Sequence, residues 1–257
     1  MYDLDATTYR STAFDARERS ISFLVIHYTA APFNASINAL AKGRDVSAHY
    51  LVPTADDPTY RRAGFDKVRI FSLVDERQRA WHAGVSAWAN ESGLNHSAIG
   101  IELVNEASFS NGRFEFPAYS SEQIAALIQL CQAIIERYPA ITPCRVLGHS
   151  DISIGRKSDP GAAFPWLQLH RAGIGAWYDE GLKADYHAQF SRQLPDPTAI
   201  FDKLRQYGYS VPAQPEPAFR QRLLRAFQLH FRPDDHRGAL DAETAAILYA
   251  LVDRYRT

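Results

Sequence analysis

The chain has 257 residues, which suffices for one large domain or for a large domain with a small one beside it. A hydrophobic content of 46% and a charged content of 22% describe an ordinary globular protein. A formal net charge of −1 argues against nucleic acid as a partner. No apolar run is long enough to span a bilayer, so we expect no transmembrane segment. The two cysteines predict no disulfide framework and are interpreted as structural.

The first two thirds of the chain alternate between strand and helix signals. After a polar lead-in of residues 1–20, residues 23–27 form a continuous apolar run that predicts a strand covered on both faces, with His27 at its end. The strand predicted at 98–104 is equally apolar except for Glu102. This alternation indicates an α/β fold. The remaining elements are expected as a short helix at 33–41, strands at 47–53 and 68–74, an exposed loop at 54–67, a helix at 119–138 with a capping box formed by Ser120 and Gln123, a last strand that ends at His149, and a short helix that ends near residue 173.

The tail of the chain differs from the first part in composition. Proline-rich connectors separate three predicted helices, which start at Pro197, near residue 218 and at Asp241. Each helix has a single apolar stripe, so together they predict a small three-helix bundle. We therefore expect a larger domain at 1–180 and a helical domain at 190–257. The apolar stripes of the tail helices are expected to pack only against one another.

Residues 148–161 gather a histidine, a lysine and an aspartate among turn-forming residues. Pro160 disfavours helix at Asp159 and favours an extended backbone. Lys157 and Asp159 lie two residues apart, so in an extended segment they point the same way, beside the imidazole of His149. Two alternatives stay open at this point: a solvated loop has the same composition, and a histidine that ends a core strand is more often structural than a ligand.

His27, His149 and Asp159 together provide two imidazoles and one carboxylate, which leaves one position for water in a catalytic zinc site. Zinc supplies water that is acidic enough to ionise near neutral pH. Glu102 is the candidate general base, because a glutamate in a buried strand requires a nearby cation. Lys157 would stabilise the oxyanion that forms when water attacks a carbonyl carbon. The combination predicts hydrolysis of an amide.

Five motifs in this order resemble the zinc-dependent N-acetylmuramoyl-L-alanine amidases of the AmpD/AmiD type. They lie at 25–30 (VIHYTA), 47–52 (SAHYLV), 81–84 (WHAG), 99–102 (IGIE) and 148–161 (GHSDISIGRKSDPG). The resemblance covers roughly residues 20–178. It implies a mixed central sheet flanked by helices, as in the peptidoglycan-recognition proteins, and cleavage between the lactyl group of N-acetylmuramic acid and the L-alanine of the stem peptide. It also implies zinc ligands at His27, His149 and Asp159, a base at Glu102, an electrostatic catalyst at Lys157, and substrate contacts at Trp81, His82, Asn95 and Arg156.

The resemblance continues into the tail. Residues 224–233 (LRAFQLHFRP) and 238–244 (GALDAET) are similar to the helical peptidoglycan-binding module of the two-domain amidases. The alternative from another class is a peptidoglycan-recognition protein that binds without chemistry. Such proteins generally lack a zinc ligand, whereas all three positions are filled in this chain. A zinc-dependent sugar deacetylase would share the ligands but not the motifs.

The cellular compartment is a separate expectation. The N-terminus is polar and lacks the apolar region of a signal peptide, so we expect either no Sec export or a leader outside this sequence. A second binding site for the substrate is useful only when the substrate is a polymer. We therefore expect action on intact peptidoglycan, in the periplasm or cell envelope. The alternative is a cytoplasmic enzyme that acts on 1,6-anhydro muropeptides, and the oligomeric state is left open.

Overall fold

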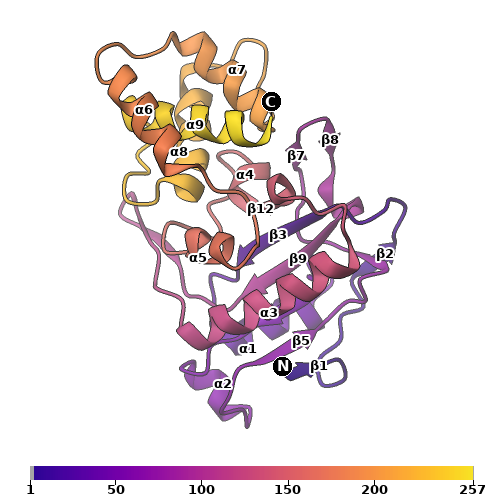
Figure 1. Ribbon diagram of the computed structural model, residues 1–257. Coiled ribbons are helices and arrows are strands. Elements are labelled where there is room, and N and C mark those ends of the chain that lie inside the picture. Colours follow the sequence, from indigo (N-terminus) through magenta and orange to yellow (C-terminus); the bar gives the residue numbers. More distant parts are fainter. Residues whose placement is uncertain (1–2, 257) are drawn as a thin grey trace.

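The computed structural model describes residues 3–256, and it confirms the α/β fold with a mixed central sheet (Figure 1). Across the sheet, the strands lie in the order β1 (Asp3–Asp5), β5 (Arg69–Ser72), β4 (Tyr50–Val52), β9 (Ala98–Leu103), β3 (Phe23–Tyr28) and β12 (Val146–Gly148). The β4–β5 pair is antiparallel, and the other four pairs are parallel. Three two-stranded ladders lie outside this sheet: β2 (Phe14–Ala16) with β6 (Gln78–Ala80), β7 (Ala87–Trp88) with β8 (Glu91–Ser92), and β10 (Ser108–Ser110) with β11 (Arg113–Glu115).

Helices cover both faces of the sheet. The α-helices are α1 (Phe33–Ile37), α2 (Pro58–Arg62), α3 (Ser121–Arg137), α4 (His149–Ile152), α5 (Trp166–Arg171), α6 (Glu180–Phe190), α7 (Pro197–Tyr207), α8 (Pro217–Phe231) and α9 (Ala242–Tyr255). A π-helical turn, η1 (Asn38–Lys42), extends α1, and the short 3₁₀ turns are η2 (Leu94–His96) and η3 (Pro143–Arg145). On β4, Tyr50 and Val52 pack into the larger core together with α3, whereas Leu51 packs on the other face with α1 and α2. This alternation explains why the central strands read as apolar on both faces.

The long helix α3 starts as the sequence predicts, but its capping box is only half formed. The Ser120 hydroxyl accepts a hydrogen bond from the backbone N–H of Gln123. The side-chain amide of Gln123 does not return to Ser120. It donates instead to the carbonyl oxygen of Val52, at the end of β4, and to that of Val104, just after β9. These hydrogen bonds connect the N-terminus of α3 to the carboxyl ends of the central strands, where the candidate site residues lie.

Several elements differ from the sequence expectation. The polar lead-in contributes the edge strand β1 and the short strand β2. The loop expected at 54–67 contains α2, which Asp57 caps by accepting from the backbone N–H of Thr59 and Tyr60. Up to residue 256 the tail has four helices, because α6 precedes the three expected ones. Phe190 is the buried residue of α6, and its ring packs against Tyr249 on α9. A helix with so little buried surface has a weak apolar stripe, which explains why its sequence did not indicate it.

The tail does not pack only on itself, so that expectation is wrong. One apolar cluster contains buried residues of the sheet, of α3 and of the tail helices. At the junction, Trp88 on β7 is 1% exposed, and the backbone N–H of Ala89 donates to the carbonyl oxygen of Gly208. Gly208 has φ +143, and an added Cβ would lie 2.6 Å from the Trp88 ring, so glycine is required there.

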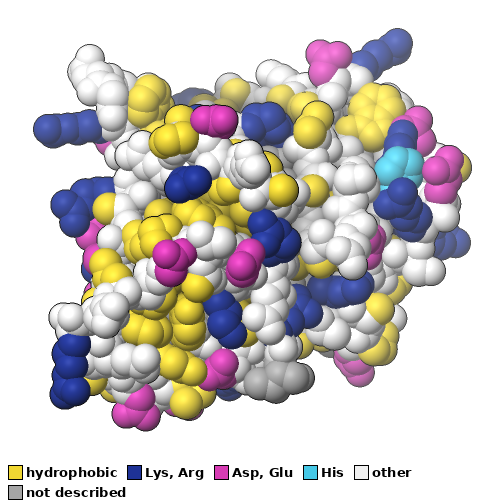
Figure 2. Space-filling view, turned by 90° about the horizontal axis from the view of Figure 1, so that it is seen from above, with side chains coloured by type: hydrophobic (Ala, Val, Ile, Leu, Met, Phe, Trp, Pro, Cys, Tyr) yellow, Lys and Arg dark blue, Asp and Glu magenta, His cyan; other side chains and the backbone are white. Residues whose placement is uncertain are grey.

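Figure 2 looks onto the end of the molecule that carries the C-terminal helices, which lie at the top of Figure 1. Lys and Arg side chains are intermingled with Asp and Glu side chains on this face, among apolar groups.

Within residues 3–256, no helix is both long and apolar enough to cross a membrane.

Candidate active site

Polar side chains form a row at the carboxyl ends of three adjacent parallel strands. In the sheet register, His27 on β3 lies beside Glu102 on β9. At the end of β12, Gly148 lies beside Ile26, so His149 follows next to His27. The carboxyl ends of parallel strands are where open α/β sheets place their ligands. The sheet itself therefore brings together two of the predicted metal ligands and the predicted base.

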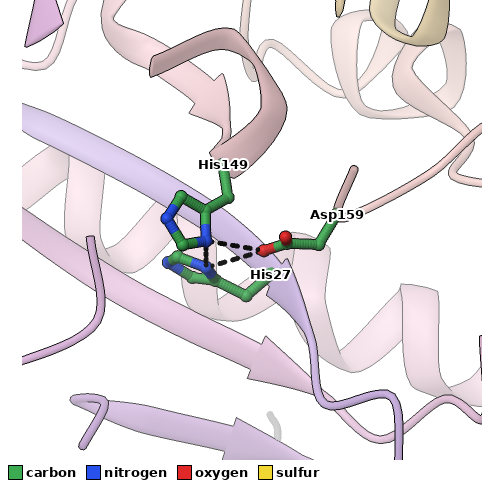
Figure 3. Close-up of side chains that lie close together, drawn as sticks. All are labelled: His27, His149 and Asp159. Atoms are coloured by element: carbon green, nitrogen blue, oxygen red, sulfur yellow. Dashed lines mark hydrogen bonds and ion pairs between the residues drawn. The ribbon is translucent and has the colours of Figure 1, made fainter. Parts of the chain in front are cut away.

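Asp159 completes a cluster of three donor atoms (Figure 3). Nδ1 of His27 lies 3.0 Å from Nδ1 of His149, and Oδ2 of Asp159 lies 2.9 Å from the first and 3.0 Å from the second. All three side chains are buried. Zinc binds nitrogen and oxygen ligands at about 2.0–2.1 Å, which separates tetrahedral donors by about 3.3 Å. A small outward movement of the donors admits such an ion, so these residues fit a zinc site.

The loop that carries Asp159 is held against the start of α4. The backbone N–H of Ser150 donates to the carbonyl oxygen of Asp159 at 2.9 Å. Gly148 allows the loop to approach, because an added Cβ at this position would lie 2.8 Å from Cδ of Pro160. The glycine before His149 is therefore needed to bring the carboxylate of Asp159 into the cluster.

The protonation states suit metal binding. Burial, followed by the imidazole of His149, lowers the pKa of His27 to about 4. Burial alone would raise the pKa of Asp159, but the imidazoles of His149 and His27 outweigh it and hold this pKa below its usual value. At neutral pH the cluster thus offers a carboxylate and a neutral His27, the forms in which these side chains bind a metal.

Both histidines are oriented by contacts on their other ring nitrogen. Nε2 of His149 lies 3.0 Å from the carbonyl oxygen of Ala83, and Nε2 of His27 lies 3.0 Å from Nδ1 of His82. With Nδ1 directed to a metal, each Nε2–H donates outward, as metal-binding histidines usually do. Burial lowers the pKa of His82 well below its usual value, which keeps it neutral and able to accept at Nδ1. Gly100 makes room for this ring, since a Cβ would lie 2.4 Å from its Cγ.

The loop that carries His82 and Ala83 is supported from behind by Asn95. Oδ1 of Asn95 accepts the backbone N–H of His82 at 3.0 Å and that of Ala83 at 2.7 Å. Asn95 is not among the residues that line the adjacent pocket, whereas Trp81, His82 and Arg156 are. Three of the four predicted contact residues thus face the pocket, and the fourth holds the loop that forms its wall.

Glu102 and Lys157 also face this pocket, beside the donor cluster. Oε2 of Glu102 is buried and has no hydrogen-bond partner among the described residues. Burial, followed by the carboxylate of Asp159, raises the pKa of Glu102 well above its usual value, and Lys157 partly opposes this rise. A carboxyl group with a raised pKa can both take and return a proton near neutral pH. Lys157 is exposed and makes no ion pair within residues 3–256.

The sequence of the chain matches the N-acetylmuramoyl-L-alanine amidase family over residues 17–162. It is also 43% identical to the N-acetylmuramoyl-L-alanine amidase AmiD of Escherichia coli K12 over 256 residues, which cover 99% of this chain and 89% of that protein. The chain belongs to the N-acetylmuramoyl-L-alanine amidase family. This assignment confirms the resemblance seen in the five motifs.

Two solved structures that are similar in sequence to this chain have the same fold. AmpDh3 from Pseudomonas aeruginosa, in complex with anhydromuramic pentapeptide, aligns with a TM-score of 0.90 and 51% identity over 100% of both chains. AmiD from E. coli, in complex with the substrate anhydro-N-acetylmuramic acid-L-Ala-D-gamma-Glu-L-Lys, aligns with a TM-score of 0.81 and 41% identity. This alignment covers 97% of the present chain and 94% of that one. Both alignments include the helical tail, so it is part of the shared architecture.

The tail of this amidase contributes to the pocket, which the sequence did not predict. The pocket has a volume of about 540 Å³, and Arg222, Arg225, Ala226 and Leu229 of α8 line one part of it. These residues come from the region expected to be a separate domain. Their sequence signal is that of an ordinary amphipathic helix, so nothing local marks them as pocket residues.

A buried carboxylate fastens α8 to the amidase core. Asp151 on α4 is 0% exposed, and its Oδ2 accepts the backbone N–H of Gly148 at 2.8 Å. Tyr209 donates its hydroxyl to Oδ1 at 2.6 Å, and Nδ1 of His230 on α8 lies 2.7 Å from Oδ2. Asp151 lies two residues after His149, so the tail is hydrogen-bonded directly to the segment that begins with this candidate metal ligand.

Proposed function

We propose that this amidase binds one zinc ion through His27, His149 and Asp159. We propose that it hydrolyses the amide between the lactyl group of N-acetylmuramic acid and the L-alanine of the peptidoglycan stem peptide. The observation that carries the proposal is the buried cluster of three donor atoms, which lies beside the unpartnered Oε2 of Glu102. The complete ligand set and the adjacent carboxyl group argue against a binding protein without chemistry.

Each residue has a task in this proposal. A bound zinc ion supplies a Lewis acid that polarises the amide carbonyl and acidifies water. Oε2 of Glu102 takes the proton from the attacking water and passes it to the departing amine of L-alanine, for which its raised pKa is suited. The ammonium of Lys157 stabilises the negative charge that develops on the carbonyl oxygen. The products are the lactyl carboxylic acid of the sugar and a free stem peptide.

The remaining candidates are proposed to position the substrate. Trp81 and Arg156 line the pocket, and both are fixed by hydrogen bonds. Trp81 donates through Nε1 to Asp15, and Arg156 donates to the carbonyl oxygens of Ala83 and Val85. We propose that His82 acts mainly by orienting His27. Asn95 would hold the backbone on which His82 lies.

We further propose that the protein acts on peptidoglycan in the cell envelope, with a catalytic unit at 1–180 and a helical unit at 190–257 that adds contact to the wall. The support is the resemblance of the tail to peptidoglycan-binding modules, because a second contact raises affinity for an extended polymer. Fractionation of cells that express the full natural reading frame tests the location. Protein found only in the cytoplasm, with activity confined to soluble anhydro-muropeptides, would contradict this part.

The activity is tested with purified sacculi and mass spectrometry of the products. The expected products are intact stem peptides with a free L-alanine amine and glycan strands with free lactyl groups. Chelation should abolish this release, and added zinc should restore it. The Lys157→Ala variant should lower turnover by about 10²-fold while it retains the metal. Full activity in protein shown by elemental analysis to be metal-free would refute the zinc proposal.

A further inference from the structure

The helix α8 is held in a fixed position on the pocket. His230 near its C-terminal end contacts the buried carboxylate of Asp151, and its ring stacks on Trp166 with centroids 3.8 Å apart. Earlier on the same helix, Arg222 and Arg225 reach the pocket. A side chain on a helix that is anchored in this way lies at a defined distance from the metal centre.

The two arginines are placed by specific contacts. Arg222 lies over Gly155, where an added Cβ would be 2.2 Å from its Cδ. Arg225 is half-buried, and its guanidinium carbon lies 4.3 Å from the centroid of the Phe114 ring on β11. A guanidinium that stacks on an aromatic face keeps its N–H edge available for a planar anion. Within residues 3–256, neither arginine makes an ion pair with a carboxylate.

The charges that line the pocket are unbalanced. Four basic residues line it, namely Arg156, Lys157, Arg222 and Arg225, and two acidic residues, Glu102 and Asp159. The two acidic residues are committed to the metal centre. The arginines of α8 therefore provide positive charge for a ligand that brings its own carboxylate.

The substrate class of related amidases carries such a group. The peptide bound to AmiD from E. coli contains D-γ-glutamate. A glutamate that is linked through its γ-carboxyl group has a free α-carboxylate, one residue beyond the L-alanine whose amide is cleaved. We propose that Arg222 and Arg225 bind this free α-carboxylate of the stem peptide. The helical tail would then form the part of the active-site wall that selects substrates with a free α-carboxylate. This assignment rests on the proposed function, because it requires a stem peptide in the pocket.

The test compares two soluble substrates that differ in one group. N-acetylmuramyl-L-alanyl-D-glutamate has the free α-carboxylate, and its D-isoglutamine counterpart has a neutral amide in the same place. We expect the wild-type, zinc-loaded full chain to cleave the acid with a kcat/KM higher by on the order of tenfold, as for a partly exposed charged hydrogen bond. In the Arg222→Gln/Arg225→Gln double variant, kcat/KM on the acid should fall to the value on the amide, mainly through KM.

Arg220→Gln is the matched control, since Arg220 is an exposed arginine of α8 that does not line the pocket. It should retain the wild-type preference for the acid. The proposal is overturned if the wild type shows no preference, if the double variant keeps it, or if kcat/KM falls equally on both substrates. Cleavage of neither peptide nor sacculi by the zinc-loaded wild type would instead count against the proposed function.

Discussion

The buried carboxylate of Asp151 offers a direct test of how the tail is joined to the catalytic unit. Its two oxygens accept from the backbone N–H of Gly148, the hydroxyl of Tyr209 and Nδ1 of His230. We consider the substitution Asp151→Ala, which removes both oxygens and leaves three polar groups facing a cavity. Tyr209→Phe is the milder comparison, because it removes one hydroxyl and leaves the other contacts in place.

The magnitude follows from the burial of the site. A buried donor without an acceptor costs about 1–3 kcal/mol, and Asp151→Ala leaves three such donors. Asp151 is 0% exposed, so water cannot replace the lost oxygens without entering the core. We expect the loss of all three acceptor contacts in Asp151→Ala to lower the free energy of unfolding by about 3–5 kcal/mol. Tyr209→Phe should lower it by about 1–2 kcal/mol.

The assay is urea unfolding of the zinc-loaded full chain, followed in parallel by tryptophan fluorescence and by loss of amidase activity. Because Asp151 joins the two units, the two probes should give the same midpoint in the wild type. In Asp151→Ala, activity should be lost at lower urea than the fluorescence change of the remaining core. A loss below about 1 kcal/mol for Asp151→Ala, or a loss equal to that of Tyr209→Phe, would refute this account of the junction.

Three further predictions concern the site and its surroundings. Glu102→Gln should lower kcat by about 10²-fold, because the amide cannot carry the proton. Zinc content, measured by elemental analysis, should not change, and loss of zinc would place Glu102 among the ligands. Burial, followed by Arg17, lowers the pKa of His49 to about 3, so between about pH 6.5 and pH 3 the unfolded chain binds more protons than the folded chain. Stability should therefore fall with decreasing pH by about 1.4 kcal/mol per unit from this group. His49→Gln should flatten that part of the urea-midpoint profile, and an unchanged profile would contradict the assignment. Gly100→Ala should displace the ring of His82 and lower zinc affinity about 10–100-fold in a competition titration, as loss of a ligand's supporting contact does. Wild-type affinity would mean that the ring is not needed to orient His27.

The candidate metal ligands could be predicted because local sequence marks their positions. His27 and His149 each end an apolar run, and parallel neighbours bring such ends together. Asp159 precedes a Pro-Gly pair that forces a turn. The residues that hold the candidate ligands in place carry no comparable signal in the local sequence. That Asn95 would hold the loop behind His82, and not reach the pocket, depends on the path of the chain between distant strands.

The elements that the sequence missed have little apolar surface of their own. β1 has three residues with the burial of an edge strand, and it forms because β5 offers an open edge for pairing. α6 buries Phe190 against α9, which supplies the rest of the contact. In both cases the neighbouring element, and not the local sequence, determines that the strand or helix forms. The same holds for the arginines of α8, which have the pattern of a solvated helix face until the catalytic unit is placed beside them.

The contact between Gly208 and Trp88 bears on how such enzymes can exchange parts during evolution. The proline-rich segments of the tail look like natural breakpoints for gene recombination. A breakpoint there would bring in a foreign helix end against the Trp88 ring, where a Cβ at position 208 would be 2.6 Å away. A recombined gene would thus need glycine at that position, or a smaller residue in place of Trp88, before its product could fold. Exchange of tails among these amidases is accordingly expected only where both sides of this contact travel together.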